Sequence, residues 1–314
     1  MESERLGSGG APQIGPASVA VGNFDGVHRG HQALVAAAVS RSRATGGAAV
    51  VLTFDPHPAR VLRPQEAPAA LTTLAQKEEL VAALGIDRVV VVKFDARLAA
   101  LSPEAFAREV LQQALGARHV VVGESFRFGR GREGDPRRLA ALGASLGFAV
   151  EVVPPLVEGG RPISSSWVRE ALERGDVGEA RKLLGRDHFV DGEVVRGDGR
   201  GRTIGVPTAN LAPEEQILPA HGVYAARCRV GADAWHPAAV NVGERPTFGG
   251  GRVMLEVHLL DFDGDLYGAR LRVAFHERLR GEKRFESKEA LVAQIRRDIE
   301  AARARLPPPG GGAV

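Results

Sequence analysis

The feature that most constrains the fold is a change in the pattern of apolar residues near residue 185. Before this point, short apolar runs rich in valine alternate with stretches of helical spacing. After it, strand-like runs follow one another with Gly, Pro and Asp turns between them. Continuous apolar runs indicate strands buried on both faces, as in parallel sheets, whereas strands without intervening helices indicate antiparallel pairing. The chain therefore predicts two domains of different class.

The first half, residues 17–185, predicts a Rossmann-like, doubly wound parallel sheet. Ligands of such sheets bind beyond the carboxyl ends of the strands. The expected strands are 18–22, 48–54, 88–93, 119–123 and 148–153, and the expected helices are 76–84, 103–115 and 136–146.

The second half, residues 186–306, predicts a small antiparallel β-barrel with a C-terminal helix. That helix is expected from Ser287, a good N-cap residue, to about Arg305. Residues 1–16 and 307–314 have the Gly- and Pro-rich composition of linkers, so we expect disordered tails. The expected strands are 190–195, 222–230, 237–242, 253–262 and 269–275.

Composition excludes several classes of function. The net charge is +3 without a clustered basic run, which argues against nucleic-acid binding. No apolar run is long enough for a membrane span, and the N-terminus lacks the apolar core of a signal peptide. The single cysteine, Cys228, suits a reducing compartment. We expect a cytoplasmic protein without nucleic-acid or membrane partners, and the sequence leaves homo-oligomerisation open.

Two histidines, His28 and His31, stand where the strand at 18–22 gives way to a helix. A helix N-terminus carries unpaired amides and a favourable dipole, so it attracts phosphate. Either histidine alone is typical of a cap or a surface residue. The pair, with Gly26 and Gly30 for a tight turn and close approach, favours a nucleotide phosphate site. The H-x-G-H pattern resembles the nucleotidyltransferase superfamily, and it does not identify the acceptor.

Three further segments of the first half could contribute to such a site. Phe54–Pro58 is a rigid loop with two prolines around His57, and it reads equally as a stiff turn. The segment 124–132 alternates aromatic residues with Arg beside glycines. This pattern could stack a planar ring and hold a phosphate, and it is about equally typical of an exposed basic loop. The segment 163–169 opens a helix with three serines and Arg169, which suits the outer phosphates of ATP or an ordinary cap.

Together, NFDGVHRGH, FDPHP, VGESFRFG and ISSSWVR resemble the adenylyltransferase module of bacterial bifunctional riboflavin kinase/FMN adenylyltransferases. Two positions depart from the family pattern. Ser166 replaces the usual Thr and keeps a hydroxyl, whereas Ser125 replaces Asn and loses an amide, so we expect weaker ATP or flavin binding. The resemblance implies catalysis by His28 and His31, ATP binding by Gly22, Phe24, Asp25, Ser125, Ser164, Ser165 and Arg169, and flavin binding by Phe54, His57, Phe126 and Phe128.

In the second half, the glycine-rich segment 197–205 can curl around phosphates, and Thr208 and Asn210 offer oxygens that suit Mg2+. The same segment reads as readily as a flexible hairpin. Alternation over 253–259 places Val253, Leu255, Val257 and Leu259 on one face and Met254, Glu256 and His258 on the other. A carboxylate on the second face is usually solvated, but under a bound substrate it would be a positioned base.

The segments GRTIGVPTANL, LPAHGVYA, NVGERPTF, LEVHLLDF and LRGEKRFES resemble the riboflavin kinase module of the same family, in the same order. The resemblance implies that Glu256 is the catalytic base. It also implies that Thr208 and Asn210 hold the Mg2+ of ATP. The further ATP-binding residues implied are Gly201, Arg202 and Thr203, and the flavin-binding residues are Arg280 and Phe285.

The expected function is therefore two-step synthesis of FAD, with riboflavin phosphorylated to FMN and FMN adenylylated to FAD. ATP and Mg2+ are the expected co-substrate and metal. One alternative is an H-x-G-H transferase with another phosphate acceptor fused to a barrel that only binds flavin or nucleotide. A second alternative is a barrel that stores flavin or recognises RNA.

Overall fold

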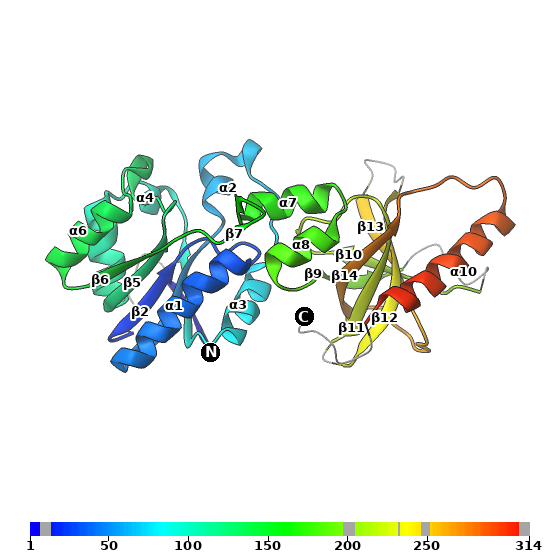
Figure 1. The fold of residues 1–314 in the computed structure, drawn as a ribbon, viewed down its shortest axis with the longest axis horizontal. Coiled ribbons are helices and arrows are strands. Elements are labelled where there is room, and N and C mark those ends of the chain that lie inside the picture. Colours follow the sequence, from blue (N-terminus) through cyan, green and yellow to red (C-terminus); the bar gives the residue numbers. More distant parts are fainter. Residues whose placement is uncertain (7–13, 197–204, 232, 246–251, 308–314) are drawn as a thin grey trace. The chain divides into compact units, whose positions relative to one another are not determined.

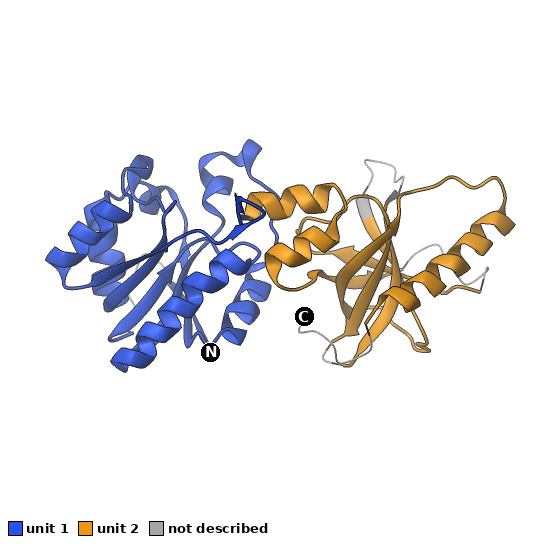
Figure 2. Ribbon diagram, viewed as in Figure 1, with its two compact units in different colours: residues 1–164 blue, residues 165–314 orange. Residues whose placement is uncertain are grey.

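The computed structural model describes residues 1–6, 14–196, 205–231, 233–245 and 252–307. Contacts divide the chain into two units, Met1–Ser164 and Ser165–Val314 (Figure 2). No helix in the described ranges combines the length and apolar character that a membrane crossing requires.

A six-stranded parallel sheet forms the centre of the first unit (Figure 1). The strand order is β1-β4-β3-β2-β5-β6, which confirms the predicted doubly wound class. The order reverses between β2 and β5, so the carboxyl ends of these two strands frame the crevice where such sheets bind ligands. The strands are β1 (Glu2–Leu6), β2 (Ala17–Val21), β3 (Ala48–Asp55), β4 (Arg88–Lys93), β5 (Ala117–Gly123) and β6 (Ala149–Val153).

Helices cover both faces of this sheet. Alternate residues of the strands enter two separate cores, one with α1 and α3 and the other with η2 and α6. This arrangement explains the continuous apolar runs, because both faces of each central strand are buried. The elements are α1 (Arg29–Thr45), α2 (Pro58–Leu62), η1 (Pro64–Glu66), α3 (Leu74–Ala83), α4 (Ala96–Ala99), α5 (Pro103–Ala105), η2 (Phe106–Ala114), η3 (Arg130–Arg132), α6 (Pro136–Leu146) and the short strands β7 (Val157–Glu158) and β8 (Arg161–Pro162).

The N-terminal tail expected over residues 1–16 is wrong in its first part. Glu2–Leu6 form β1, an edge strand that pairs in parallel with β4. Arg88 on β4 forms ion pairs with Glu2 and Glu4. Linker-like composition did not indicate this strand, because its pairing partner lies far along the chain. Residues 7–13 lie outside the described residues.

The second unit begins with two helices that the sequence analysis assigned to the first domain. α7 (Ser165–Glu173) packs on α8 (Val177–Leu184), and α8 packs on strands β9 and β14. The unit boundary at 164/165 therefore precedes the expected boundary at 185, because these helices bury their apolar faces within the second unit.

A closed antiparallel barrel fills the rest of this unit, in the order β10-β13-β12-β11-β14-β9, and confirms the predicted architecture. α10 (Lys288–Arg305) follows, and Ser287 caps it by accepting a hydrogen bond from the amide of Ala290. Residues 308–314 of the expected C-terminal tail lie outside the described residues. The strands are β9 (His188–Val195), β10 (Ala209–Pro213), β11 (Gly222–Val230), β12 (Trp235–Arg245), β13 (Arg252–Leu259) and β14 (Arg270–Arg280).

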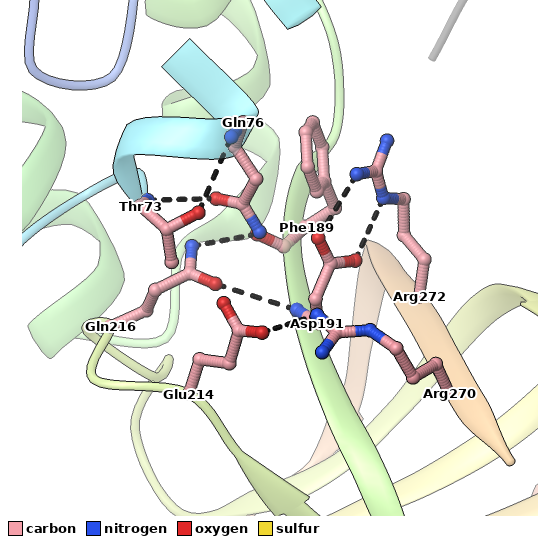
Figure 3. A network of polar contacts seen from close by, with 8 residues as sticks. All are labelled: Thr73, Gln76, Phe189, Asp191, Glu214, Gln216, Arg270 and Arg272. Carbon is pink, nitrogen blue, oxygen red and sulfur yellow. Dashed lines mark hydrogen bonds and ion pairs between the residues drawn. The ribbon is translucent and has the colours of Figure 1, made fainter. Parts of the chain in front are cut away.

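Two arginines of β14 show how differently ion pairs are placed on the barrel (Figure 3). Arg272 forms a bidentate pair with Asp191 at 2.8 and 2.9 Å and lies 4.2 Å from the ring centroid of Phe189. Both charged side chains of this pair are only 13% exposed. Arg270 pairs with Glu214, but its side chain is 68% exposed. Only the first pair is shielded enough to contribute strongly to stability.

We predict that Arg272→Met lowers the free energy of unfolding of the second unit by about 2–3 kcal/mol, because the shielded carboxylate of Asp191 loses its bidentate pair with this guanidinium. The matched control Arg270→Met should cost less than about 1 kcal/mol. Both tryptophans, Trp167 and Trp235, lie in this unit, so urea unfolding followed by tryptophan fluorescence reports on it. Equal costs for the two variants would contradict the assignment.

Candidate active sites

The loop between β2 and α1 has a strained backbone. Phe24 and Val27 adopt positive φ angles of 48° and 42°, and Gly26 adopts 82°. A positive φ is especially unfavourable for a β-branched residue such as Val27. The side chains of Phe24 and Val27 are 0% and 1% exposed, so their burial holds the loop in this conformation.

A buried carboxylate, Asp25, ties this loop to the segment before α3. Its Oδ1 accepts hydrogen bonds from the backbone amides of Leu71 at 2.9 Å and Thr72 at 3.2 Å. The Thr72 hydroxyl in turn accepts from the amide of Gly26 at 3.1 Å. Asp25 is 6% exposed, so these bonds form away from competing water.

This loop presents the two histidines at the start of α1, as the sequence predicted. His28 is the N-cap residue, and its Nδ1 accepts from the amide of His31 at 3.2 Å. The neutral ring of His28 therefore carries its proton on Nε2. The two rings stack with centroids 3.6 Å apart. A Cβ on Gly30 would lie 3.1 Å from the His28 ring, which explains the need for glycine there.

His31 is held as a neutral ring. Burial lowers its pKa well below the ordinary value, and His28 and the Lys77 ammonium lower it further. In the described part of the chain, no hydrogen-bond partner meets its buried Nδ1. Near neutral pH, His31 can thus offer a hydrogen bond to an anion but not a full charge.

The remaining predicted ATP contacts of the first unit divide into exposed and buried groups. Ser125 is exposed beyond the end of β5, beside the crevice. The buried side chains of Phe24 and Asp25 support the loop, so contacts from these two residues to ATP would have to come from their backbone. Ser164 ends the first unit, and Ser165 and Arg169 belong to α7 of the second.

The four flavin contacts predicted for the first unit also differ in how far they are exposed. The prediction that Phe128 contacts the flavin needs correction, because this residue is only 6% exposed within the core around η2. The chain returns at Gly134 and packs against its ring. Phe126 stacks on Phe128 at 5.5 Å and remains partly exposed. Phe54 lies edge-on to Phe94 and is also partly exposed.

His57, the fourth predicted flavin contact, caps α2. Its Nδ1 accepts from the amide of Ala59 at 3.1 Å, so the proton of the neutral ring is on Nε2. The side-chain Nδ2 of Asn23 lies 3.3 Å from Nε2, and with the carboxamide turned over, its oxygen takes that place and accepts this proton. His57 is thereby joined to the loop that carries the two histidines.

In the second unit, Glu256 lies in a row of polar residues across three strands. It pairs in register with Asn210 on β10 and with Asn241 on β12. Its neighbours Leu255 and Val257 are 0% and 1% exposed inside the barrel, which confirms the predicted alternation. Glu256 thus stands on the outer face of the sheet between two carboxamides. Strand β10, which was not expected from the sequence, supplies Asn210.

A pocket of about 290 Å³ adjoins this row. One wall is the segment Pro207–Asn210, which includes the predicted metal ligands Thr208 and Asn210. His258 fixes this wall by donating from Nδ1 to the carbonyl of Pro207 at 2.8 Å. The other wall is the connection 262–267, which the sequence analysis did not single out. Gly201, Arg202 and Thr203 lie outside the described residues.

The segment 280–285 is anchored at Arg280. The guanidinium forms a bidentate pair with Asp298 of α10, whose carboxylate is 8% exposed, and lies 5.7 Å from the Phe285 ring. Further along this segment, the carboxylate of Glu282 occupies the space that a Cβ on Gly243 would fill. Asn241, the register partner of Glu256, borders the same space. The segment therefore reaches the face that carries Glu256.

Comparison with known proteins matches each half of the chain to one enzyme family. Residues 11–167 match the FAD synthetase family and residues 184–306 match the riboflavin kinase family. A bifunctional riboflavin kinase/FMN adenylyltransferase of Escherichia coli (strain K12) is 42% identical over 93% of both chains. The protein of that name from Bacillus subtilis (strain 168) is 37% identical over 90% of both chains.

A crystal structure described as a macrolide-efflux protein from Streptococcus pneumoniae has the same fold. It superposes with a TM-score of 0.87 at 32% identity, over 96% of this chain and 99% of its own. The chain belongs to the family of bifunctional riboflavin kinases/FMN adenylyltransferases, and it synthesises FAD from riboflavin through FMN.

Proposed function

We propose that the second unit phosphorylates riboflavin, with Glu256 as the general base. Glu256 would accept the proton of the ribityl 5'-hydroxyl as that oxygen attacks the γ-phosphorus of ATP, and ADP would leave. The position of Glu256 between Asn210 and Asn241 supports this role, because two carboxamides can orient the carboxylate and the hydroxyl. The register of these three residues is the observation that carries the proposal.

Mg2+ is the metal that the oxygen donors beside Glu256 fit. Thr208 and Asn210 would hold it, with the phosphates of ATP completing the coordination. The described residues contain no cluster of three or more His, Cys, Asp or Glu side chains suited to a metal. Mg2+ commonly takes few protein ligands and binds through substrate phosphates. When bound, it neutralises charge on the transferring phosphoryl group.

We propose that the pocket beside Thr208 receives the nucleotide. Tyr267, whose side chain is about half exposed, and Phe262 offer aromatic surface for the base. Gly201, Arg202 and Thr203 would contact the phosphates, as the family resemblance implies. Arg280, held by Asp298, would act mainly as the anchor of the segment that covers the flavin, with Phe285 against the ring system.

The first unit would adenylylate FMN without a covalent enzyme intermediate. The FMN phosphate would attack the α-phosphorus of a second ATP and expel pyrophosphate. His28 and His31 would donate hydrogen bonds to the triphosphate at the N-terminus of α1. The unpartnered Nδ1 of His31 and the fixed tautomer of His28 support this assignment.

The remaining predicted contacts are proposed for the same reaction, as the family resemblance implies them. Ser164, Ser165 and Arg169 would hold the departing pyrophosphate, and Gly22 and Ser125 would contact ATP. Phe54, His57 and Phe126 would contact the flavin. We propose that the enzyme works in the cytoplasm, where its free, buried Cys228 stays reduced.

We predict that Glu256→Gln lowers FMN formation by about 10²- to 10⁴-fold, because a positioned base is lost. FAD formation from added FMN should not change. The matched control is Glu193→Gln, the same change at an exposed position of the barrel, which should leave both activities intact. Flavins separated over time measure both steps, and unchanged FMN formation in Glu256→Gln would show that Glu256 is not the base.

We predict that His28→Asn separates the two roles of His28. Asn is a good N-cap, so the stability of α1 should hold, whereas FAD formation should fall by about 10²-fold or more. His28→Ala should also lose about 1 kcal/mol of stability, because the cap is removed. FMN formation is the internal control in both variants. Wild-type FAD formation in a folded His28→Asn would contradict the role.

A further inference from the structure

A nearly buried lysine lies close to the histidine pair, and the roles proposed above do not use it. Lys77 of α3 is 7% exposed, and its Nζ lies 3.3 Å from the hydroxyl of Thr53. An ammonium has three donors. Across the described ranges, this hydroxyl is its hydrogen-bond partner, and no carboxylate forms an ion pair with it. Burying a charge with so little compensation is costly, and a function of the charge would explain why the residue is there.

Hydrogen bonds connect Lys77 to the loop between β2 and α1 that presents His28 and His31. Thr53, near the carboxyl end of β3, donates its hydroxyl proton to the carbonyl of Asn23 at 3.1 Å. The same hydroxyl oxygen therefore accepts from Lys77. One hydroxyl group thus separates the ammonium from the backbone that precedes His28. The capping box of Thr73 and Gln76 starts α3 and fixes the turn that carries Lys77 (Figure 3).

Nearby carboxylates do not explain the buried ammonium as a structural ion pair. Asp25, Asp55 and Glu78 are the acidic groups that act on Lys77. Asp25 accepts two backbone amides, and Glu78 accepts the hydroxyl of Ser3. Burial lowers the pKa of Lys77, and the three carboxylates act in the opposite direction. In the described residues, no carboxylate thus pairs with the Lys77 ammonium.

We propose that Lys77 is a positioning residue for nucleotidyl transfer: its buried ammonium supplies the fixed positive charge beneath the His28–His31 pair. The inference rests on the roles proposed above for the two histidines. His28, Lys77 and the Phe24 ring face His31, and the lowered pKa of His31 agrees with a cation close by. With His31 neutral, Lys77 gives the site the charge that the triphosphate needs, and it helps to keep the His31 ring neutral.

The test is Lys77→Met, which removes the charge and keeps most of the volume. We expect FAD formation from FMN to fall by about 10²-fold. The NMR titration midpoint of the His31 ring should rise, because a like charge is gone, and it should stay below 6.5, because burial and His28 still lower the pKa. FMN formation should stay unchanged. Lys93→Met, which removes an exposed charge from β4, is the matched control and should change neither readout.

Wild-type FAD formation in Lys77→Met, or an unchanged His31 midpoint, would overturn the proposal. If Lys77→Met does not fold, Lys77→Arg decides, since it keeps the charge. A His31 midpoint at the wild-type value with FAD formation within about ten-fold of wild type would support the proposal, and a midpoint above the wild-type value would overturn it. His31→Asn tests the proposed role of His31 separately from the proposal for Lys77. If this variant makes FAD at the wild-type rate, the proposed role of His31 itself fails.

Discussion

The buried carboxylate of Asp25 is the constraint on which the transferase site depends. Its bonds to the backbone of Leu71 and Thr72 hold a loop in which Phe24 and Val27 adopt unfavourable positive φ angles. That loop sets His28 as the cap of α1 and stacks it on His31. Buried packing and one carboxylate thus maintain the strain that presents two imidazoles at a helix N-terminus.

Much of the first unit could be predicted from the sequence, because its strands are buried on both faces and read as apolar runs. The positions of His28 and His31 followed from local spacing in the same way. Lys77 and the burial of Phe128 did not, since both depend on segments distant in the chain. One signal for Lys77 was present: it lies four residues before Val81, so the two side chains share one face of α3.

In the second unit, alternation along 253–259 was enough to place Glu256 opposite a buried face. The strand β10 was not predicted, because its residues 209–213 include Asn and Pro and become a strand only through pairing with β9 and β13. That pairing brings Asn210 beside Glu256. The pocket wall at 262–267 was missed for the same reason, since barrel closure sets its position and local sequence does not.

The central claim is that one chain holds two chemically independent sites, one for each phosphate transfer. The most direct measurement mixes two variants that each lack one activity, His31→Asn and Glu256→Gln, with riboflavin, ATP and Mg2+, and follows FMN and FAD over time. We predict that neither variant alone forms FAD at more than a trace rate, whereas the mixture forms FMN and then FAD. A mixture that accumulates FMN without FAD, or forms neither flavin, would contradict two independent sites.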